Sequence, residues 1–173
     1  MSSGRIARAK AIGHSVEDLV IEQFDALDAV FDENAHHDAV THDLLSPQLV
    51  DVAAPVVWAG IPLVETDTRV EIKAAKRWTK DGDSRLRGRW LLKGRDDGQH
   101  AAILDAAGVY ALAIYDETPA AERVLVAVAI IPASLLDEHL RGRWWSVDRR
   151  EGTFARLGWP HVIDADTLGG ADD

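Results

Sequence analysis

The sequence contains no cysteine, which excludes disulfide bonds and metal sites built from thiolates. It also has no run of about 20 apolar residues, the length that a membrane-spanning helix needs. The first ten residues include basic side chains, but no apolar segment follows them, so we expect no secretory signal. These absences together predict a cytoplasmic protein that does not enter a membrane.

The length of the chain limits how it can be organised. Its 173 residues fit one domain and are enough to bury a sizeable core. Residues 1–14 show little apolar periodicity and are expected to form a flexible arm. We expect a single domain over residues 15–163, followed by an acidic tail over residues 164–173 that frays.

Acidic residues outnumber basic ones over the whole chain, but one segment reverses the balance. The net charge is −10. Within residues 69–95, ten basic side chains accompany three acidic ones, so this segment carries +7 and the rest of the chain −17. The distribution of charge matters more than its sum, and a concentrated basic segment favours local phosphate binding.

The first half of the chain predicts a helix, a loop and a group of strands. Apolar residues recur at helical spacing over residues 15–32, and Ser15 with Asp18 has the spacing of a capping box. Residues 33–48 are polar and are expected to be a loop. Its three histidines are too few for a structural zinc site, which usually has four ligands. Strands are predicted at 49–52, 55–58, 61–65 and 69–74, with the last two paired as a hairpin through residues 66–68.

The second half alternates helices with apolar strands. A polar stretch over 79–88 contains a turn at residues 81–84, and a strand follows at 89–92. The remaining predicted elements are a helix at 97–107 that Gly108 ends, strands at 109–115 and 123–131, and a helix at 132–140. This succession predicts an α/β fold in which helices flank a central mixed sheet.

The most informative segment is Arg69-Val70-Glu71-Ile72-Lys73-Ala74. Alternate residues of a strand share a face, so Glu71 and Lys73 project together while Val70 and Ile72 point into a core. A carboxylate can hold Mg²⁺, which prefers oxygen ligands, and a lysine can orient water or stabilise charge on phosphorus. The plainer interpretation is an ion pair on a solvated sheet face, since Glu-x-Lys is common.

This segment resembles the E-x-K half of the PD-(D/E)xK nuclease motif. The family includes archaeal Holliday-junction resolvases and type II restriction enzymes, and its core runs helix, three strands, helix, strand. The predicted elements reproduce that order, and residues 88–90, 99–100, 109–110 and 114–115 resemble the second half of such nucleases. The resemblance covers about residues 15–131. It implies a restriction-endonuclease-like core with Glu71 and Lys73 in the active site.

The chain departs from the family pattern at the first half of the motif, because it contains no Pro-Asp pair. The resemblance requires another carboxylate that holds the metal together with Glu71. Asp51 is the first choice, since it can enter the sheet from a strand start near the site. Glu65 is a rival, because the predicted hairpin would bring it near Glu71. Asp67 is better explained as a turn residue.

The resemblance also suggests residues that assist. Gln99 begins the second predicted helix, where the family sometimes supplies a polar side chain, and His100 is adjacent. Glu17 occupies a helix where some relatives add a metal carboxylate, although a solvated role is favoured. The basic segment leads toward the expected DNA groove, where it would neutralise phosphates. Its predicted DNA-binding residues are Lys76, Arg77, Lys80, Arg85, Arg87, Arg89, Lys93 and Arg95.

Aromatic residues accompany the basic ones. Trp78 and Trp90 can stack on bases or pack beneath the loop, and packing is favoured. A second basic and aromatic patch covers residues 141–145, and three roles stay open for it: DNA contact, a dimer surface, or burial.

The leading hypothesis is an endodeoxyribonuclease that depends on Mg²⁺, with Mn²⁺ as a substitute, and resolves junctions or acts like a restriction enzyme. A homodimer is expected, because two strands must be cut. The alternative is an inactive nuclease fold that binds nucleic acid or a protein partner. A further alternative is an interaction module in which the Glu71–Lys73 pair is only structural.

Overall fold

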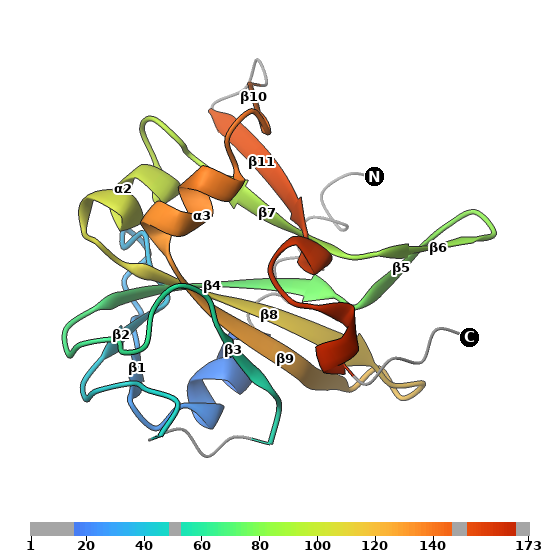
Figure 1. Cartoon of the computed structure of the whole chain (residues 1–173), viewed down its shortest axis with the longest axis horizontal. Helices are drawn as coiled ribbons and strands as arrows, with labels where there is room; N and C mark the ends of the chain where they lie inside the picture. The colour runs from blue at the N-terminus through green and yellow to red at the C-terminus, as the bar shows by residue number, and fades with distance from the viewer. Residues whose placement is uncertain (1–15, 49–52, 147–151, 169–173) are drawn as a thin grey trace.

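A six-stranded mixed sheet forms the centre of the computed structural model, which describes residues 16–48, 53–146 and 152–168 (Figure 1). From one edge to the other, its strands are β1 (Leu27–Ala29), β2 (Ala39–Thr41), β4 (Arg69–Lys76), β8 (Val109–Glu117), β9 (Arg123–Pro132) and β3 (Val56–Trp58). The pairs β4–β8 and β9–β3 are parallel, and the other neighbours are antiparallel.

The sheet is covered on both faces. On one face, Val70 and Ile72 of β4 pack with Val16 and Val20 from a helix over residues 16–23. On the other face, residues of β8 pack beneath α2 (Gln99–Asp105) and α3 (Ala133–His139). Because both faces are buried, β8 and β9 are almost continuously apolar, as expected for central strands.

A smaller three-stranded sheet extends the layer that holds α2 and α3 (Figure 1). Its order is β10 (Trp144–Ser146), β11 (Thr153–Gly158) and β7 (Arg89–Lys93). The inner residues of this sheet join the core, and Trp90 donates from Nε1 to the carbonyl of Ala113 at 2.9 Å. A hairpin of β5 (Trp78–Asp81) and β6 (Ser84–Arg87) connects β4 to β7.

Gly88 lets the chain cross the end of β4 between this hairpin and β7. A Cβ atom at Gly88 would lie 1.7 Å from the carbonyl oxygen of Lys76. The Gly88 amide donates to the Arg77 carbonyl at 3.2 Å, and the Trp159 indole donates to the same carbonyl at 2.9 Å. Trp159 begins the 3₁₀ turn η1 (Trp159–His161), and η2 (Ala165–Leu168) follows.

The α/β class and the predicted order of helix, three strands, helix, strand are confirmed. The helix over residues 16–23, strands β1, β2 and β4, helix α2 and strand β8 follow one another in that order, with β3 inserted before β4 and β5, β6 and β7 inserted after it. The predicted elements at 55–58, 89–92, 97–107, 109–115, 123–131 and 132–140 correspond to β3, β7, α2, β8, β9 and α3.

Three predictions in the first half of the chain are wrong. The helix ends at Gln23 rather than 32, and the expected loop over 33–48 contains β2. Residues 61–65 form no strand, so the hairpin with β4 is absent, and only an isolated bridge joins Val64 to Leu45. β1 and β2 have three residues each, too few to show a clear period of two. The apolar residues of β1 continued the helical spacing before it, and β2 lies in a mostly polar stretch.

Other predictions fall partly outside the described residues. The N-terminal arm, Ser15, the strand at 49–52 and residues 169–173 all lie there. Strands β10 and β11 were not predicted. Within the described residues, no helix is long and apolar enough to cross a membrane.

Candidate active site

Strand β4 places Glu71 and Lys73 on one face, as the alternation predicted. Glu71 is 1% exposed although it is charged at neutral pH in water, and Lys73 is partly exposed. Their side chains form an ion pair between Nζ of Lys73 and Oε1 of Glu71. The plainer interpretation of a solvated sheet face is therefore wrong for Glu71, which is buried on a strand that α2 and β7 contact.

Asp38, immediately before β2, lies opposite Glu71. The register pairs Ala39 with Val70, and the Asp38 amide donates to the Val70 carbonyl at 3.0 Å. In return, Oδ2 of Asp38 accepts a hydrogen bond from the Ile72 amide at 2.8 Å. These bonds fix the Asp38 carboxylate at the same level of the sheet as Glu71, so two adjacent strands bring two carboxylates together.

The surroundings of Glu71 favour its protonated form in the absence of a cation. Burial raises the pKa of Glu71, the Lys73 ammonium partly offsets that rise, and the negative charge of Asp38 adds to it, so that the pKa is about 8. Oε2 of Glu71 is buried and has no hydrogen-bond partner among the described residues. An ionised Glu71 therefore needs an additional positive group, and a bound cation would satisfy that need.

The oxygen donors at this place suit a hard divalent cation. Mg²⁺ is commonly bound through one or two carboxylates and keeps several of its waters. Asp38 and Glu71 would supply two carboxylates, and the unpartnered Oε2 is a free ligand atom. Among the described residues, no group of three or more Asp, Glu, His or Cys could hold a metal, so these two carboxylates fit a divalent cation that keeps several of its waters.

A buried polar network lies beside the carboxylates. Tyr110 is the register partner of Glu71 on β8, and its hydroxyl is 2.9 Å from Nδ1 of His100. Nε2 of His100 is 3.1 Å from Oδ1 of Asp137 on α3. Burial is the main reason that the pKa of Tyr110 is raised and that of His100 is lowered. The network links β8, α2 and α3 behind the site.

The other sequence candidates differ in where they lie. Asp51 is outside the described residues. Glu65 is exposed, and its backbone carbonyl accepts the hydroxyls of Thr41 and Thr68 at 2.6 and 2.8 Å. The hairpin that would bring Glu65 to Glu71 is absent, because β2 pairs with that edge of β4.

Three further candidates occupy helices or turns. Gln99 is half-buried at the start of α2, and the next residue, His100, is the one that enters the core. Glu17 lies on the helix over residues 16–23. Asp67 is exposed with a φ of 60°, which agrees with its interpretation as a turn residue.

Sequence reasoning missed Asp38 because it assigned residues 33–48 to a loop. One local signal was available: Asp38 directly precedes Ala39-Val40-Thr41, a short run with two β-branched residues. The pairing of that run with β4 is a long-range contact, which no local pattern encodes. A search for every Asp that precedes a short β-branched run would have included it.

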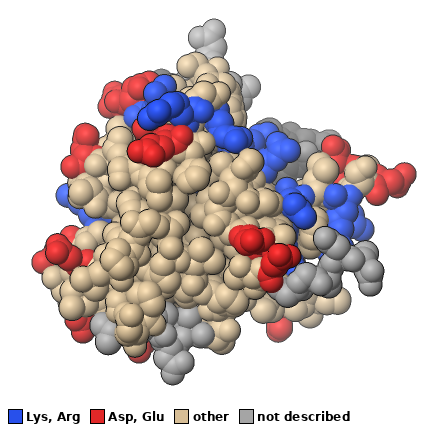
Figure 2. All heavy atoms as spheres, viewed as in Figure 1, with Lys and Arg blue, Asp and Glu red and all other residues tan. Residues whose placement is uncertain are grey.

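The basic residues divide into two groups. Lys76 pairs with Glu117, and Arg77 lies 3.6 Å from Asp116, so acidic partners on β8 already engage these two. The others on the predicted list are exposed: Lys80, Arg85, Arg87, Arg89, Lys93 and Arg95. Figure 2 shows Lys and Arg gathered from the region of β10 and β11 toward the β5–β6 hairpin.

The tryptophans also divide into buried and exposed ones. Trp90 is fully buried, which confirms the packing role for that residue. Trp78 is half-buried, and the Arg85 guanidinium lies 4.2 Å from its ring centroid. In the patch over residues 141–145, Trp144 packs 5.2 Å from the His100 ring, whereas Trp145 is 38% exposed.

A comparison with family models gives one match, the PD-(D/E)XK nuclease superfamily domain, over residues 3–164. No curated protein and no solved structure matches the chain significantly. The matched region includes β4 with Glu71 and Lys73, as well as Asp38 and the α2 helix. The chain therefore belongs to the PD-(D/E)XK nuclease superfamily, as the Glu71-Ile72-Lys73 segment had suggested.

Proposed function

We propose that this protein is a metal-dependent endodeoxyribonuclease that hydrolyses phosphodiester bonds at the Asp38–Glu71–Lys73 site. The observation that carries the proposal is the buried Glu71 carboxylate, which faces Asp38 and contacts Lys73, and whose Oε2 has no hydrogen-bond partner among the described residues. A structural ion pair needs neither a second carboxylate nor an unpartnered oxygen, so this arrangement favours catalysis over the plainer interpretation.

Asp38 and Glu71 would hold the divalent cation, Mg²⁺ or its substitute Mn²⁺. Asp38 takes the role for which Asp51 and Glu65 were the sequence candidates. A cation bound there supplies Lewis-acid polarisation of the phosphate and a lower pKa for the attacking water. The backbone hydrogen bond from Ile72 holds Asp38 in place, and burial keeps Glu71 in one orientation.

Lys73 acts on the reacting atoms. Its ammonium group pairs with Oε1 of Glu71 and remains partly exposed, so it can reach a phosphate at the surface. There it orients the attacking water by hydrogen bonding or stabilises the negative charge that develops on the phosphoryl oxygens. Removing one such donor typically lowers the rate about 10²- to 10³-fold.

The exposed basic residues position the substrate. Lys80, Arg85, Arg87, Arg89, Lys93 and Arg95 bind DNA phosphates, which fixes the duplex without reading its sequence. We also propose a homodimer, because cutting two strands at one place requires two sites. Junction resolution and restriction-like cleavage are the two activities that fit such a dimer.

A cleavage assay tests the function. Supercoiled plasmid and a labelled four-way junction are incubated with Mg²⁺ or Mn²⁺ over a range of salt concentrations, beside Lys73→Ala. We expect metal-dependent cutting that falls about 10²- to 10³-fold in the variant, and the better substrate distinguishes junction resolution from restriction-like activity.

If the parent protein cuts neither substrate under any of these conditions, the proposal that it is a nuclease is wrong. DNA binding that persists in that case would support the inactive nuclease fold. Equal cutting by the parent and Lys73→Ala would show that the chemistry uses another group.

A further inference from the structure

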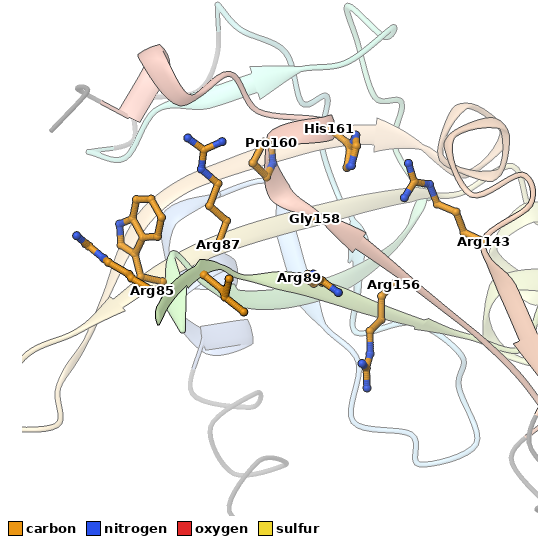
Figure 3. Close-up of a pocket in the computed structure, with 10 residues that line it drawn as sticks. Arg85, Arg87, Arg89, Arg143, Arg156, Gly158, Pro160 and His161 are labelled. Atoms are coloured by element: carbon orange, nitrogen blue, oxygen red, sulfur yellow. The ribbon is translucent and has the colours of Figure 1, made fainter. Parts of the chain in front are cut away.

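A groove of about 720 Å³ lies on the smaller sheet and contains five arginines, Arg85, Arg87, Arg89, Arg143 and Arg156. Its lining also includes Trp78 and His161 and, among the described residues, no acidic one. Figure 3 shows the five arginines around the groove, with Pro160 and His161 along one side. Five guanidinium groups in one groove repel one another unless an anion compensates their charge. The groove is therefore suited to an anionic ligand.

The arginines come from segments that are far apart in the sequence. Arg85 and Arg87 belong to β6, and Arg89 begins β7. Arg143 directly precedes β10, and Arg156 lies on β11. Pairing of Gly158 with Arg89 in the β11–β7 ladder brings two of these segments together. The fold therefore concentrates positive charge beyond what the basic segment at 69–95 supplies.

Aromatic rings hold several of these guanidinium groups. Arg85 lies 4.2 Å from the Trp78 ring centroid, Arg87 lies 5.8 Å from Trp78 and 5.5 Å from Trp159, and Arg156 lies 5.6 Å from Trp145. A guanidinium that stacks on a ring keeps its N–H edge free for phosphate oxygens. Within the described residues, none of the five arginines forms a salt bridge with a carboxylate.

The groove is separate from the proposed active site. Its walls attach to the far end of β4, where the Gly88 amide and the Trp159 indole both bind the Arg77 carbonyl. Arg77 lies six residues after Glu71, so the hairpin end of the groove is about 20 Å from Glu71 at roughly 3.3 Å per residue. A duplex spans that distance in about six base pairs at 3.4 Å each. At the other end, Arg143 precedes Trp144, whose ring centroid is 5.2 Å from that of His100.

We propose that this arginine groove is a second binding site that takes the phosphodiester backbone of a nucleic-acid strand, with its hairpin end about six nucleotides from the bond that is cut. The distance to the cut rests on the proposed function, whereas the binding itself does not. Five guanidinium groups along an open groove exceed what a single phosphate can accept, so a chain of phosphates fits them better.

Equilibrium binding tests the groove. Fluorescence anisotropy measures the affinity of a labelled 20-base-pair duplex and of the corresponding single strand, without divalent metal, over a range of salt concentrations. The variant is Arg143→Gln with Arg156→Gln, and the matched control is Arg141→Gln, an exposed arginine of the same region outside the groove.

We expect the double variant to bind at least about 10-fold more weakly at low salt. Its slope of log K against log salt should fall by about 0.9 for each lost duplex contact, or about 0.7 for a single strand, while the control keeps the slope of the parent. Whichever ligand shows the larger loss identifies duplex or single strand as the source of the phosphates. The pair Arg143→Lys with Arg156→Lys keeps the charge and should fall between variant and parent.

Equal affinity and slope in the parent and the double variant would overturn the groove. An equal loss in the Arg141→Gln control would overturn it too, because a general charge effect would then explain the result. Both outcomes are independent of cutting. If the protein cleaves plasmid but the groove arginines do not bind DNA, the proposed nuclease activity stands and the groove proposal fails. If the groove binds but no cleavage occurs, only the groove proposal stands. All three substituted arginines are exposed, so unchanged thermal unfolding confirms that the variants fold.

Discussion

The two ends of β4 hold opposite kinds of charged group in opposite surroundings. At its beginning, Glu71 is buried beside Asp38, and Lys73 is its neighbouring cation within the part of the chain that the structure describes. At its far end, the arginines of the groove are largely exposed and have aromatic rings rather than carboxylates beside them. One strand thus joins the two carboxylates of the proposed metal site to the arginines of the proposed phosphate-binding groove.

The difference lies in how each end meets water. Burial makes each charge at the carboxylate end strongly dependent on its partners, so small changes there alter pKa values and chemistry. Exposed arginines interact through screened charge, so each one contributes modestly and in proportion to the number of contacts. We therefore expect substitutions at the carboxylate end to have large effects and single substitutions at the arginine end to have small ones.

The pH dependence of stability should show the largest effect of burying Glu71. The folded state raises the pKa of Glu71 from 4.5 to about 8, so the unfolded chain releases this proton at a lower pH than the folded protein does. Without metal, the free energy of unfolding should fall as pH rises from about 4.5 through about 8, by a few kcal/mol. Urea unfolding at a series of pH values in EDTA measures it.

Glu71→Gln is the matched variant, because it keeps the shape of the side chain and cannot ionise. We expect it to remove most of this decline, so that it equals the parent near pH 5 and exceeds the parent in stability near pH 9. A parent and a variant whose stabilities decline together would mean that Glu71 ionises normally in the folded protein.

Gly88→Ala should destabilise the protein by disturbing the contact between the end of β4 and β7. A Cβ atom 1.7 Å from the Lys76 carbonyl oxygen cannot fit without moving the backbone that carries β7 away from β4. We expect a loss of about 3 kcal/mol, which lowers the thermal midpoint by roughly 6–12 °C for a domain of this size. Differential scanning calorimetry measures the shift.

The control is Gly82→Asn in the same hairpin. Gly82 has a φ of 59° and no atom within 4 Å of an added Cβ, and asparagine tolerates this conformation. A midpoint that changes equally in both variants would remove the close approach at Gly88 as the cause.

Tyr110→Phe should have a smaller effect, and it distinguishes the buried polar network from the carboxylates in front of it. It leaves Nδ1 of the fully buried His100 without its partner, which costs about 1–3 kcal/mol. Because the network lies behind the carboxylates, plasmid cleavage should change by less than about tenfold. Chemical denaturation and cleavage rates measure the two effects, and a rate loss as large as that of Lys73→Ala would give Tyr110 a catalytic role.

The sequence predicted well the elements with long, regular patterns. β4, β8 and β9 have eight to ten residues, and their apolar alternation or continuous apolar character identified them. Glu71 and Lys73 became the site candidates because their spacing on a strand and the order of elements around them matched a known family. These features depend on local sequence, which a single chain displays in full.

The parts that failed depend on long-range pairing. β1 and β2 have three residues each and owe their conformation to β4, and β10 and β11 owe theirs to β7. Asp38 could not be singled out, because its position opposite Glu71 arises only when β2 pairs with β4. The arginine groove was missed in part for the same reason, since Arg156 reaches it through the β11–β7 ladder.

The most direct test of the account is the rate of Mg²⁺-dependent plasmid cleavage by Asp38→Asn compared with Asp67→Asn. Asp67 loses the same charge in an exposed turn just before β4, where its φ of 60° suits asparagine. Loss of a metal carboxylate removes several kcal/mol of transition-state stabilisation, so Asp38→Asn should be at least about 100-fold slower, with Asp67→Asn equal to the parent. Full activity in Asp38→Asn, with the loss appearing instead in Asp51→Asn, would contradict the pairing of Asp38 and Glu71 as the metal-holding carboxylates.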